Sequence, residues 1–103
     1  MTPVFEALAD PTRRRLLERL RRGGALRLTE LAAGQQITRQ AIAKHLDSLA
    51  QAGLVTVERR GRERLHRLEP EPLRQVEKWL APYAAAWDRR LARLKAHVEE
   101  EDR

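Results

Sequence analysis

The feature that constrains the fold most is a change of sequence periodicity at Gly53. Before this glycine, residues 38–52 place apolar side chains at the spacing of a helix that lies on a core, at Ala41, Ile42, Leu46 and Leu49. After it, residues 54–59 are rich in β-branched side chains, residues 60–62 can turn, and residues 63–68 can return as a second strand. Because an isolated hairpin is marginally stable, the sequence predicts a hairpin that packs against helices.

Further helices are predicted before this pair of elements. Asp10 can cap a helix that begins with Pro11 and ends at a pair of glycines, and residues 3–9 form an apolar helix before it. Thr29 is expected to start a very short helix that ends at Gly34. The segment before Gly53 therefore contains four helices.

The last predicted helix, residues 71–100, carries a long apolar stripe at Val76, Leu80, Tyr83, Trp87, Leu91, Leu94 and Val98. Pro82 interrupts the stripe and is expected to kink or split the helix, because proline removes one backbone hydrogen bond. We expect one domain over residues 1–103, with a core of residues 4–68. The order of elements, mainly α with a small β-hairpin, is that of a winged helix-turn-helix with a long C-terminal helix.

The charge balance favours a polyanionic partner. Lys and Arg total 21 against 15 Asp and Glu, for a net charge of +6, and only three of the basic residues are lysines. Guanidinium groups suit phosphates and guanine edges, so the composition favours nucleic acid. The absence of cysteine excludes thiolate metal sites and fits a reducing cytoplasm. The longest uncharged stretch, residues 48–57, is ten residues, so no membrane span is expected, and Glu6 and Asp10 near the start do not fit the basic and then apolar pattern of a secretory signal.

Five motifs occur in an order that points to one family. They are residues 8–17 (LADPTRRRLL), 28–32 (LTELA), 38–46 (TRQAIAKHL), 52–55 (AGLV) and 60–62 (RGR). With these motifs the sequence resembles the ArsR family of bacterial transcriptional repressors, closely over residues 4–68. Since cysteine is absent, the resemblance is to a branch without a thiolate metal site.

The resemblance implies a dimeric repressor whose helix of residues 38–52 enters the major groove of double-stranded DNA. The N-terminal residues of such a helix reach base edges, so the candidate DNA-binding residues here are Thr38, Arg39, Gln40, Ala43, Lys44 and His45. Arg39 can bind guanine with both arms of its guanidinium, and Gln40 can do the same to adenine. Thr38 is equally expected as the helix cap, and His45 is expected either to touch a phosphate or to pack.

The predicted hairpin, residues 54–68, acts in this interpretation as the wing. Five arginines stand against two glutamates in residues 58–67. We expect Arg60 and Arg62 at the tip to contact DNA, whereas Arg64 and Arg67 fit DNA contact and a charged edge that prevents aggregation about equally. The six arginines of the helix that follows Asp10 form another basic face, and one of its first three is expected to contribute.

No metal, cofactor or catalytic site is expected. Metal-sensing members of the family carry a histidine two residues after an aspartate on the last helix. In this sequence Asp88 is followed at that spacing by Arg90, so the ligand pair is absent. Ser48 lies one helical turn from His45, but such pairs arise by chance, and the chain has no thiol or glycine-rich phosphate loop. We therefore do not expect an enzyme. The sequence leaves a small-molecule effector open.

Neither of the two remaining histidines is expected to bind a ligand. His66, on the same strand face as Leu68, is expected to pack in the wing rather than to bind a ligand. His97 is expected to be a solvated residue near the end of the last helix.

A long apolar helix outside a small core needs a surface against which to bury its stripe. Dimerisation is the simplest answer, and the family resemblance implies it, with the first and last helices in contact. The interface candidates are Val4, Phe5, Leu8, Trp79, Tyr83, Trp87, Leu91 and Leu94. The aromatic members of this set could instead line a ligand pocket.

Two functions from different classes remain open. The favoured one is a homodimeric regulator, expected to be a repressor, that recognises an inverted repeat in DNA. The alternative is a winged-helix module or anti-repressor that binds protein and no DNA. Because the exposed side of residues 38–52 carries Arg, Gln and Lys rather than apolar side chains, DNA is favoured.

Overall fold

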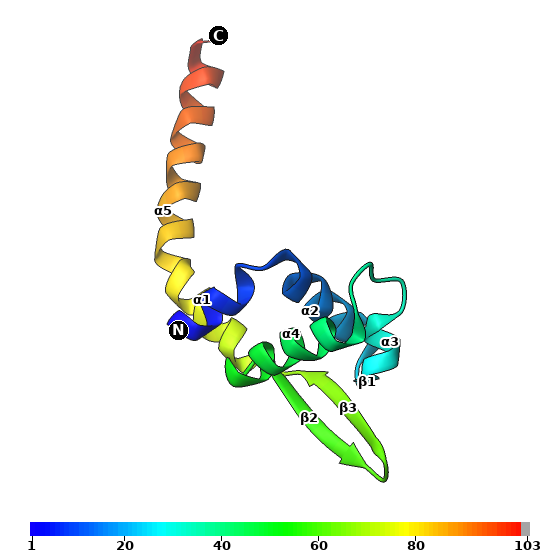
Figure 1. Ribbon diagram of the computed structural model, residues 1–103. Helices are drawn as coiled ribbons and strands as arrows, with labels where there is room; N and C mark the ends of the chain where they lie inside the picture. Colours follow the sequence, from blue (N-terminus) through cyan, green and yellow to red (C-terminus); the bar gives the residue numbers. More distant parts are fainter. Residues whose placement is uncertain (102–103) are drawn as a thin grey trace. The chain divides into compact units, whose positions relative to one another are not determined.

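A computed structural model describes residues 1–101 of the chain, which divides into two compact units, residues 1–73 and the remainder from residue 74 onward. The first unit contains, in order, α1 (Thr2–Leu8), α2 (Pro11–Gly23), β1 (Leu26–Arg27), α3 (Leu28–Ala32), α4 (Arg39–Gln51), β2 (Val55–Arg60) and β3 (Glu63–Leu68) (Figure 1). The last helix, α5 (Glu71–Glu101), begins at the end of the first unit and forms the second.

Two of the predicted helix caps are confirmed. The Asp10 carboxylate accepts the backbone N–H of Arg13 at 3.0 Å, and the Thr38 hydroxyl accepts that of Ala41 at 3.1 Å. These bonds satisfy amide groups that the first turn of a helix leaves without a partner. The predicted start of the short helix at Thr29 was wrong by one residue.

That helix, α3, begins at Leu28 because the backbone before it is capped by another side chain. The Glu30 carboxylate reaches back to the backbone N–H of Arg27 at 3.1 Å. An acidic side chain at the third helical position commonly forms this contact. The prediction placed the start of the helix at Thr29 and did not include this contact of Glu30.

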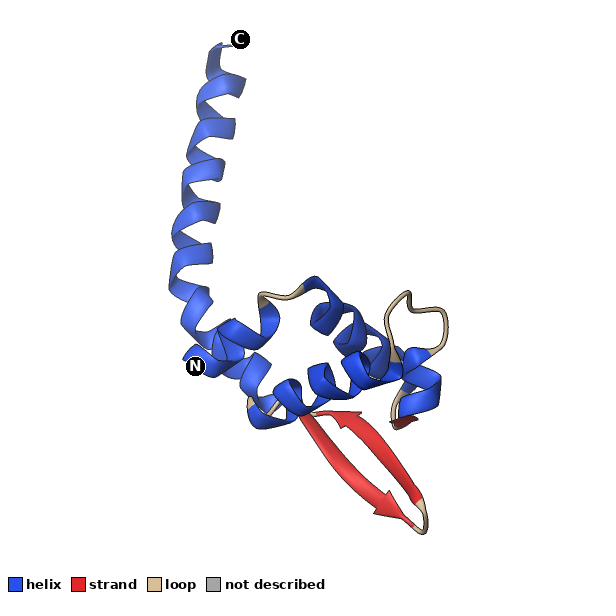
Figure 2. Cartoon of the chain, viewed as in Figure 1, coloured by secondary structure: helices blue, strands red, loops and turns tan. Residues whose placement is uncertain are grey.

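The three strands form one antiparallel sheet in the order β1-β3-β2, with the hairpin of β2 and β3 projecting beyond the helices (Figure 2). Arg60 pairs with Glu63, so the turn is shorter than predicted and consists of Gly61 and Arg62. Gly61 has a φ of 62°, which glycine adopts without steric cost. Strand β1 was not predicted from the sequence, because its two residues are too few to show a period.

The core lies among α2, α3, α4 and the base of the hairpin. Its largest fully buried side chains are Leu16, Leu20, Leu31, Ile42, Leu46, Leu49 and Leu54. The predicted stripe of α4 thus lies on the core, with Ala41 only half-buried at its margin. Val4 also belongs to this core, because it is 7% exposed.

The α5 helix runs without a break past Pro82, so of the two predicted effects of this proline, a kink or a split, the split does not occur. A helix that loses one backbone hydrogen bond at a proline can continue when its other bonds hold. None of its described residues is buried. No helix within residues 1–101 has the length and apolarity that crossing a membrane requires.

Candidate nucleic-acid interface

The first two turns of α4 expose a polar surface that faces away from the core. Arg39, Gln40 and Lys44 are exposed, and Gln40 and Lys44 lie on the side opposite Ile42 and its buried neighbours. Neither Arg39 nor Lys44 forms an ion pair with another described residue. Their donors are therefore available to an outside partner, as the sequence predicts for residues that read base edges.

Two other predicted residues of α4 have contacts within the protein. Thr38 is exposed, but its hydroxyl oxygen caps the helix, so capping is confirmed and a phosphate contact stays a prediction. Ala43 is half-buried, and it lines a cavity of about 140 Å³ together with Val57 and His66 of the hairpin. Ala43 thus offers a partner less surface than the sequence analysis assumed.

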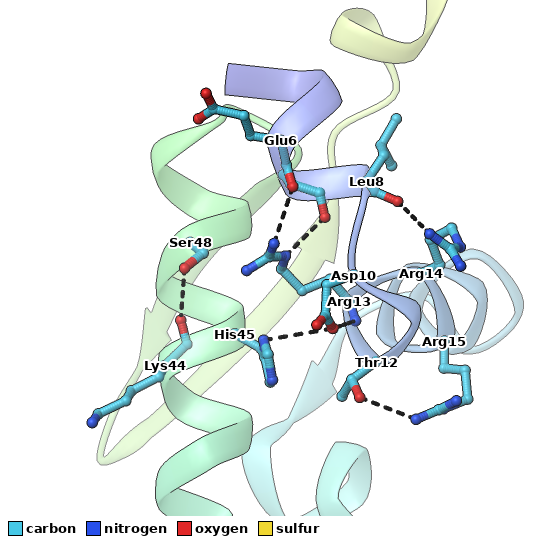
Figure 3. A network of polar contacts seen from close by, with 11 residues as sticks. Glu6, Leu8, Asp10, Thr12, Arg13, Arg14, Arg15, Lys44, His45 and Ser48 are labelled. Atoms are coloured by element: carbon cyan, nitrogen blue, oxygen red, sulfur yellow. Dashed lines mark hydrogen bonds and ion pairs between the residues drawn. The ribbon is translucent and has the colours of Figure 1, made fainter. Parts of the chain in front are cut away.

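His45 lies against the start of α2 (Figure 3). Its Nδ1 is 3.9 Å from Oδ2 of Asp10, and its side chain is 25% exposed. The backbone N–H of Arg13 lowers the pKa of Asp10, and His45 adds to this effect. Of the two predicted roles of His45, packing is the one that the structure shows, and a phosphate contact is untested.

Three arginines of α2 bind backbone carbonyl groups of neighbouring helices. Arg13 and Arg14 donate hydrogen bonds of 2.6–3.0 Å to the carbonyl oxygens of residues 6–8, at the end of α1 (Figure 3). Arg19 donates bonds of 3.0–3.1 Å to the carbonyls of residues 30–31 in α3. Cations at a helix C-terminus satisfy carbonyl groups and interact favourably with the helix dipole.

The other three arginines of α2 also have partners. Arg15 donates to the Thr12 hydroxyl at 3.0 Å, while Arg21 and Arg22 bind the Glu18 carboxylate. The hydrogen bond from Arg21 lowers the pKa of Glu18 to about 2. The partners of Arg13, Arg14 and Arg15 are neutral groups, so these arginines keep their charge, and the predicted DNA contact by one of them stays a prediction.

The predicted DNA contacts of the hairpin are all exposed, but their surroundings differ. Arg60 Nε lies 3.4 Å from Oε1 of Glu58, which partly neutralises it. Arg62 occupies the turn, and Arg64 lies in β3 without an ion pair to any described residue. Arg67 lies 3.6 Å from Glu58.

His66 is packed between the strands and α4, as the sequence analysis predicted. It is 8% exposed, and its Nδ1 lies 3.3 Å from the carbonyl oxygen of Leu26 in β1. Burial lowers the pKa of His66, and Arg64 lowers it further, whereas the Leu26 carbonyl and Asp47 raise it. The neutral imidazole therefore joins the hairpin to β1.

We expect the stability of the protein to fall as the pH drops below about 6.5, the usual pKa of histidine. The pKa of His66 is lower in the folded state, so the unfolded state binds more protons and stability rises with pH. Chemical denaturation at pH 7.5 and 5.5 measures this difference. It should shrink in His66→Gln and persist in His97→Gln, whose imidazole is exposed. An unchanged difference in His66→Gln would contradict the assignment.

Two further polar residues, His97 and Ser48, contact neighbouring residues of their own helices. His97 is exposed, and its Nε2 lies 3.0 Å from Glu101 Oε1. The Ser48 hydroxyl donates to the carbonyl of Lys44 at 3.2 Å rather than to His45. Within residues 1–101 no three His, Cys, Asp or Glu side chains lie close enough together to hold a metal ion.

The predicted dimer residues separate into two groups. Val4 is a core residue of this chain and has little surface left for a partner, so its prediction as an interface residue loses its basis. Phe5 is 39% exposed and Leu8 is half-buried. The five candidates of α5, Trp79, Tyr83, Trp87, Leu91 and Leu94, are 45–63% exposed.

Comparison with known proteins agrees with this geometry. The sequence model of a helix-turn-helix domain matches residues 8–58. The HTH-type transcriptional regulator YuzN of Bacillus subtilis (strain 168) is 44% identical over 84 residues, which cover 75% of this chain and 91% of that protein. The solved ArsR-like transcriptional regulator from Rhodococcus sp. RHA1 is 40% identical with a TM-score of 0.71, covering 91% of this chain and 88% of that one. The chain belongs to the ArsR family of winged-helix transcriptional regulators.

Another relative is named specifically as a repressor. The transcriptional repressor SdpR of Bacillus subtilis (strain 168) is 32% identical over 80 residues, which cover 78% of this chain and 88% of that protein. In this ArsR-family regulator, α3 and α4 are the helix-turn-helix pair, and the β2–β3 hairpin is the wing. The fold expected from the sequence is confirmed.

Proposed function

We propose that the protein is a homodimeric, sequence-specific repressor that binds an inverted repeat in double-stranded DNA. The observation that carries this proposal is the polar surface on the first two turns of α4. Arg39, Gln40 and Lys44 are exposed there, and both basic residues lack an ion pair within the described chain. Because charged side chains are depleted at the core of a protein–protein interface, these residues favour DNA over a protein partner.

These side chains suit the major groove, which admits one α-helix. Arg39 binds the two acceptors of guanine, and Gln40 binds adenine through its amide. Lys44 and the Thr38 hydroxyl contact phosphates at the sides of the groove. His45, which lies deeper against Asp10, adds a phosphate contact only through its outer edge.

The dimer is proposed from the exposed apolar face of α5. Seven large apolar side chains of this helix, from Trp79 to Val98, are 45–63% exposed. Monomeric soluble proteins rarely expose so large a contiguous apolar stripe, and a second copy of the chain covers it by symmetric contact. Phe5, an exposed apolar residue of the first unit, is proposed separately as an interface residue. The named repressor among the relatives supports repression rather than activation.

Salt dependence of binding tests the proposal. If the dimer neutralises about eight phosphates, a plot of log affinity against log salt concentration has a slope near −7. Fluorescence anisotropy with labelled duplex DNA, between about 50 and 200 mM salt, measures this slope. No binding, or weak binding with a flat salt response, would favour the protein-binding module instead.

A further inference from the structure

The net positive charge of the hairpin is unevenly divided between its two faces. Residues directly opposite each other on neighbouring strands share a face, and Arg59 stands opposite Arg64. The face of this pair also contains Val55, Val57, His66 and Leu68, and it carries no acidic residue. All of its charge is therefore positive.

The other face of the hairpin is electrically balanced. Its two arginines, Arg60 and Arg67, lie 3.4 and 3.6 Å from oxygens of Glu58. Its second acidic residue, Glu63, accepts a bond of 2.9 Å from the guanidinium of Arg27 in β1. The hairpin residues of this face therefore contribute no net charge.

The Arg59–Arg64 pair is unfavourable in the isolated protein. Both side chains are exposed, and neither forms an ion pair with a described residue. Like charges directly opposite each other in a sheet are destabilising, and the two side chains start roughly 5 Å apart. An anion between the two guanidinium groups would remove this repulsion.

The face that carries the pair is the one turned toward α4. Arg64 and His66 line the 140 Å³ cavity together with Ala43 and Asp47 of α4. Asp47 belongs to the same exposed stripe of α4 as Gln40 and lies within two turns of it. The two arginines and the polar surface of α4 therefore lie on adjoining parts of one unit.

We propose that Arg59 and Arg64 together hold one phosphate of the DNA backbone beside the groove that α4 enters. This inference rests on the proposed function and sharpens it, because it assigns the phosphate contact of the wing to one face. Arg59 was missing from the residues predicted from the sequence. Arg60, which was among them, lies on the balanced face beside Glu58.

Two double variants that remove the same charge test the inference. Arg59→Gln/Arg64→Gln removes the unpaired arginines, and Arg60→Gln/Arg67→Gln removes the compensated ones. The probe is a random-sequence duplex of about 30 base pairs, long enough for two half-sites one helical turn apart. In the first variant we expect the salt slope to become shallower by about two units, because each of the two wings of the dimer loses one phosphate, and affinity to fall at least about tenfold. The second variant should change both clearly less.

Thermal unfolding without DNA supplies an independent readout. The first variant should melt roughly 1 to 5 °C higher than the parent, because the repulsion is gone. The second should melt no higher, since it loses two ion pairs. Equal changes in slope and melting temperature for both variants, with parent binding intact, would overturn the phosphate assignment alone. A parent protein that binds no duplex would overturn the proposed function and this assignment with it.

Discussion

Replacing Trp87 by alanine is expected to convert the dimer into a monomer or a much weaker dimer. Trp87 is 57% exposed in the single chain and lies centrally on the apolar stripe of α5, so its burial would come from the partner. Losing a large buried aromatic side chain typically costs about 3 to 5 kcal/mol. Sedimentation at micromolar concentration measures the change, and circular dichroism should still show a helical chain.

Affinity for DNA should fall together with dimerisation, because the two half-sites are no longer bound by one linked body. Lys78→Ala is the matched control, since this residue is also exposed on α5 but lies nine positions earlier, on the opposite side of the helix from Trp87. The control should remain a dimer. A Trp87→Ala protein that stays a tight dimer would place the interface elsewhere and favour a ligand pocket lined by the aromatic residues.

Arg39→Ala and Gln40→Ala are each expected to weaken binding to the specific site by about 1 to 3 kcal/mol and to relax sequence preference. Both side chains are exposed at the start of α4, so the fold should be unaffected. Arg62→Ala, in the hairpin turn, should weaken binding to specific and scrambled duplexes alike. Competition between the two duplexes separates a lost base contact from a lost phosphate contact.

Gln51→Ala serves as the control for these variants. Gln51 is exposed on α4 like Gln40, but it lies at the opposite end of the helix, away from the predicted base contacts. It should bind as the parent does. If Arg39→Ala, Gln40→Ala and Arg62→Ala lost affinity equally for both duplexes, α4 would not be the reading helix.

Local signals predicted most of the fold. The caps at Asp10 and Thr38 depend on side chains within three residues, and the core stripe of α4 depends on helical spacing. The hairpin was predicted from its β-branched residues and from the turn at Gly61. Such features need no knowledge of distant partners, and the sequence therefore contains them directly.

Features that depend on distant partners were missed. Strand β1 exists because Leu26 pairs with His66, forty residues later in the chain. Arg19 was counted as part of a basic face, whereas it caps the end of α3. An arginine that binds phosphate and one that binds a carbonyl group have the same sequence signal, and only the fold separates them.

The assignment of the arginines to the two faces of the hairpin could be predicted only in part from the sequence. Alternation of side chains places Arg59 on the face of Val55 once that strand is buried at its base. Arg60 was favoured instead because it lies within the predicted turn. The register of the strands was the missing information, because the turn proved one residue shorter than predicted.

The most direct test of the account is a nuclease footprint on the DNA immediately upstream of the protein's own gene. A homodimer with two reading helices should protect an inverted repeat whose half-sites lie about one helical turn apart, on one face of the duplex. Protection should persist in an excess of scrambled DNA. Protection without an inverted repeat, or none that survives the competitor, would contradict a symmetric, sequence-specific regulator.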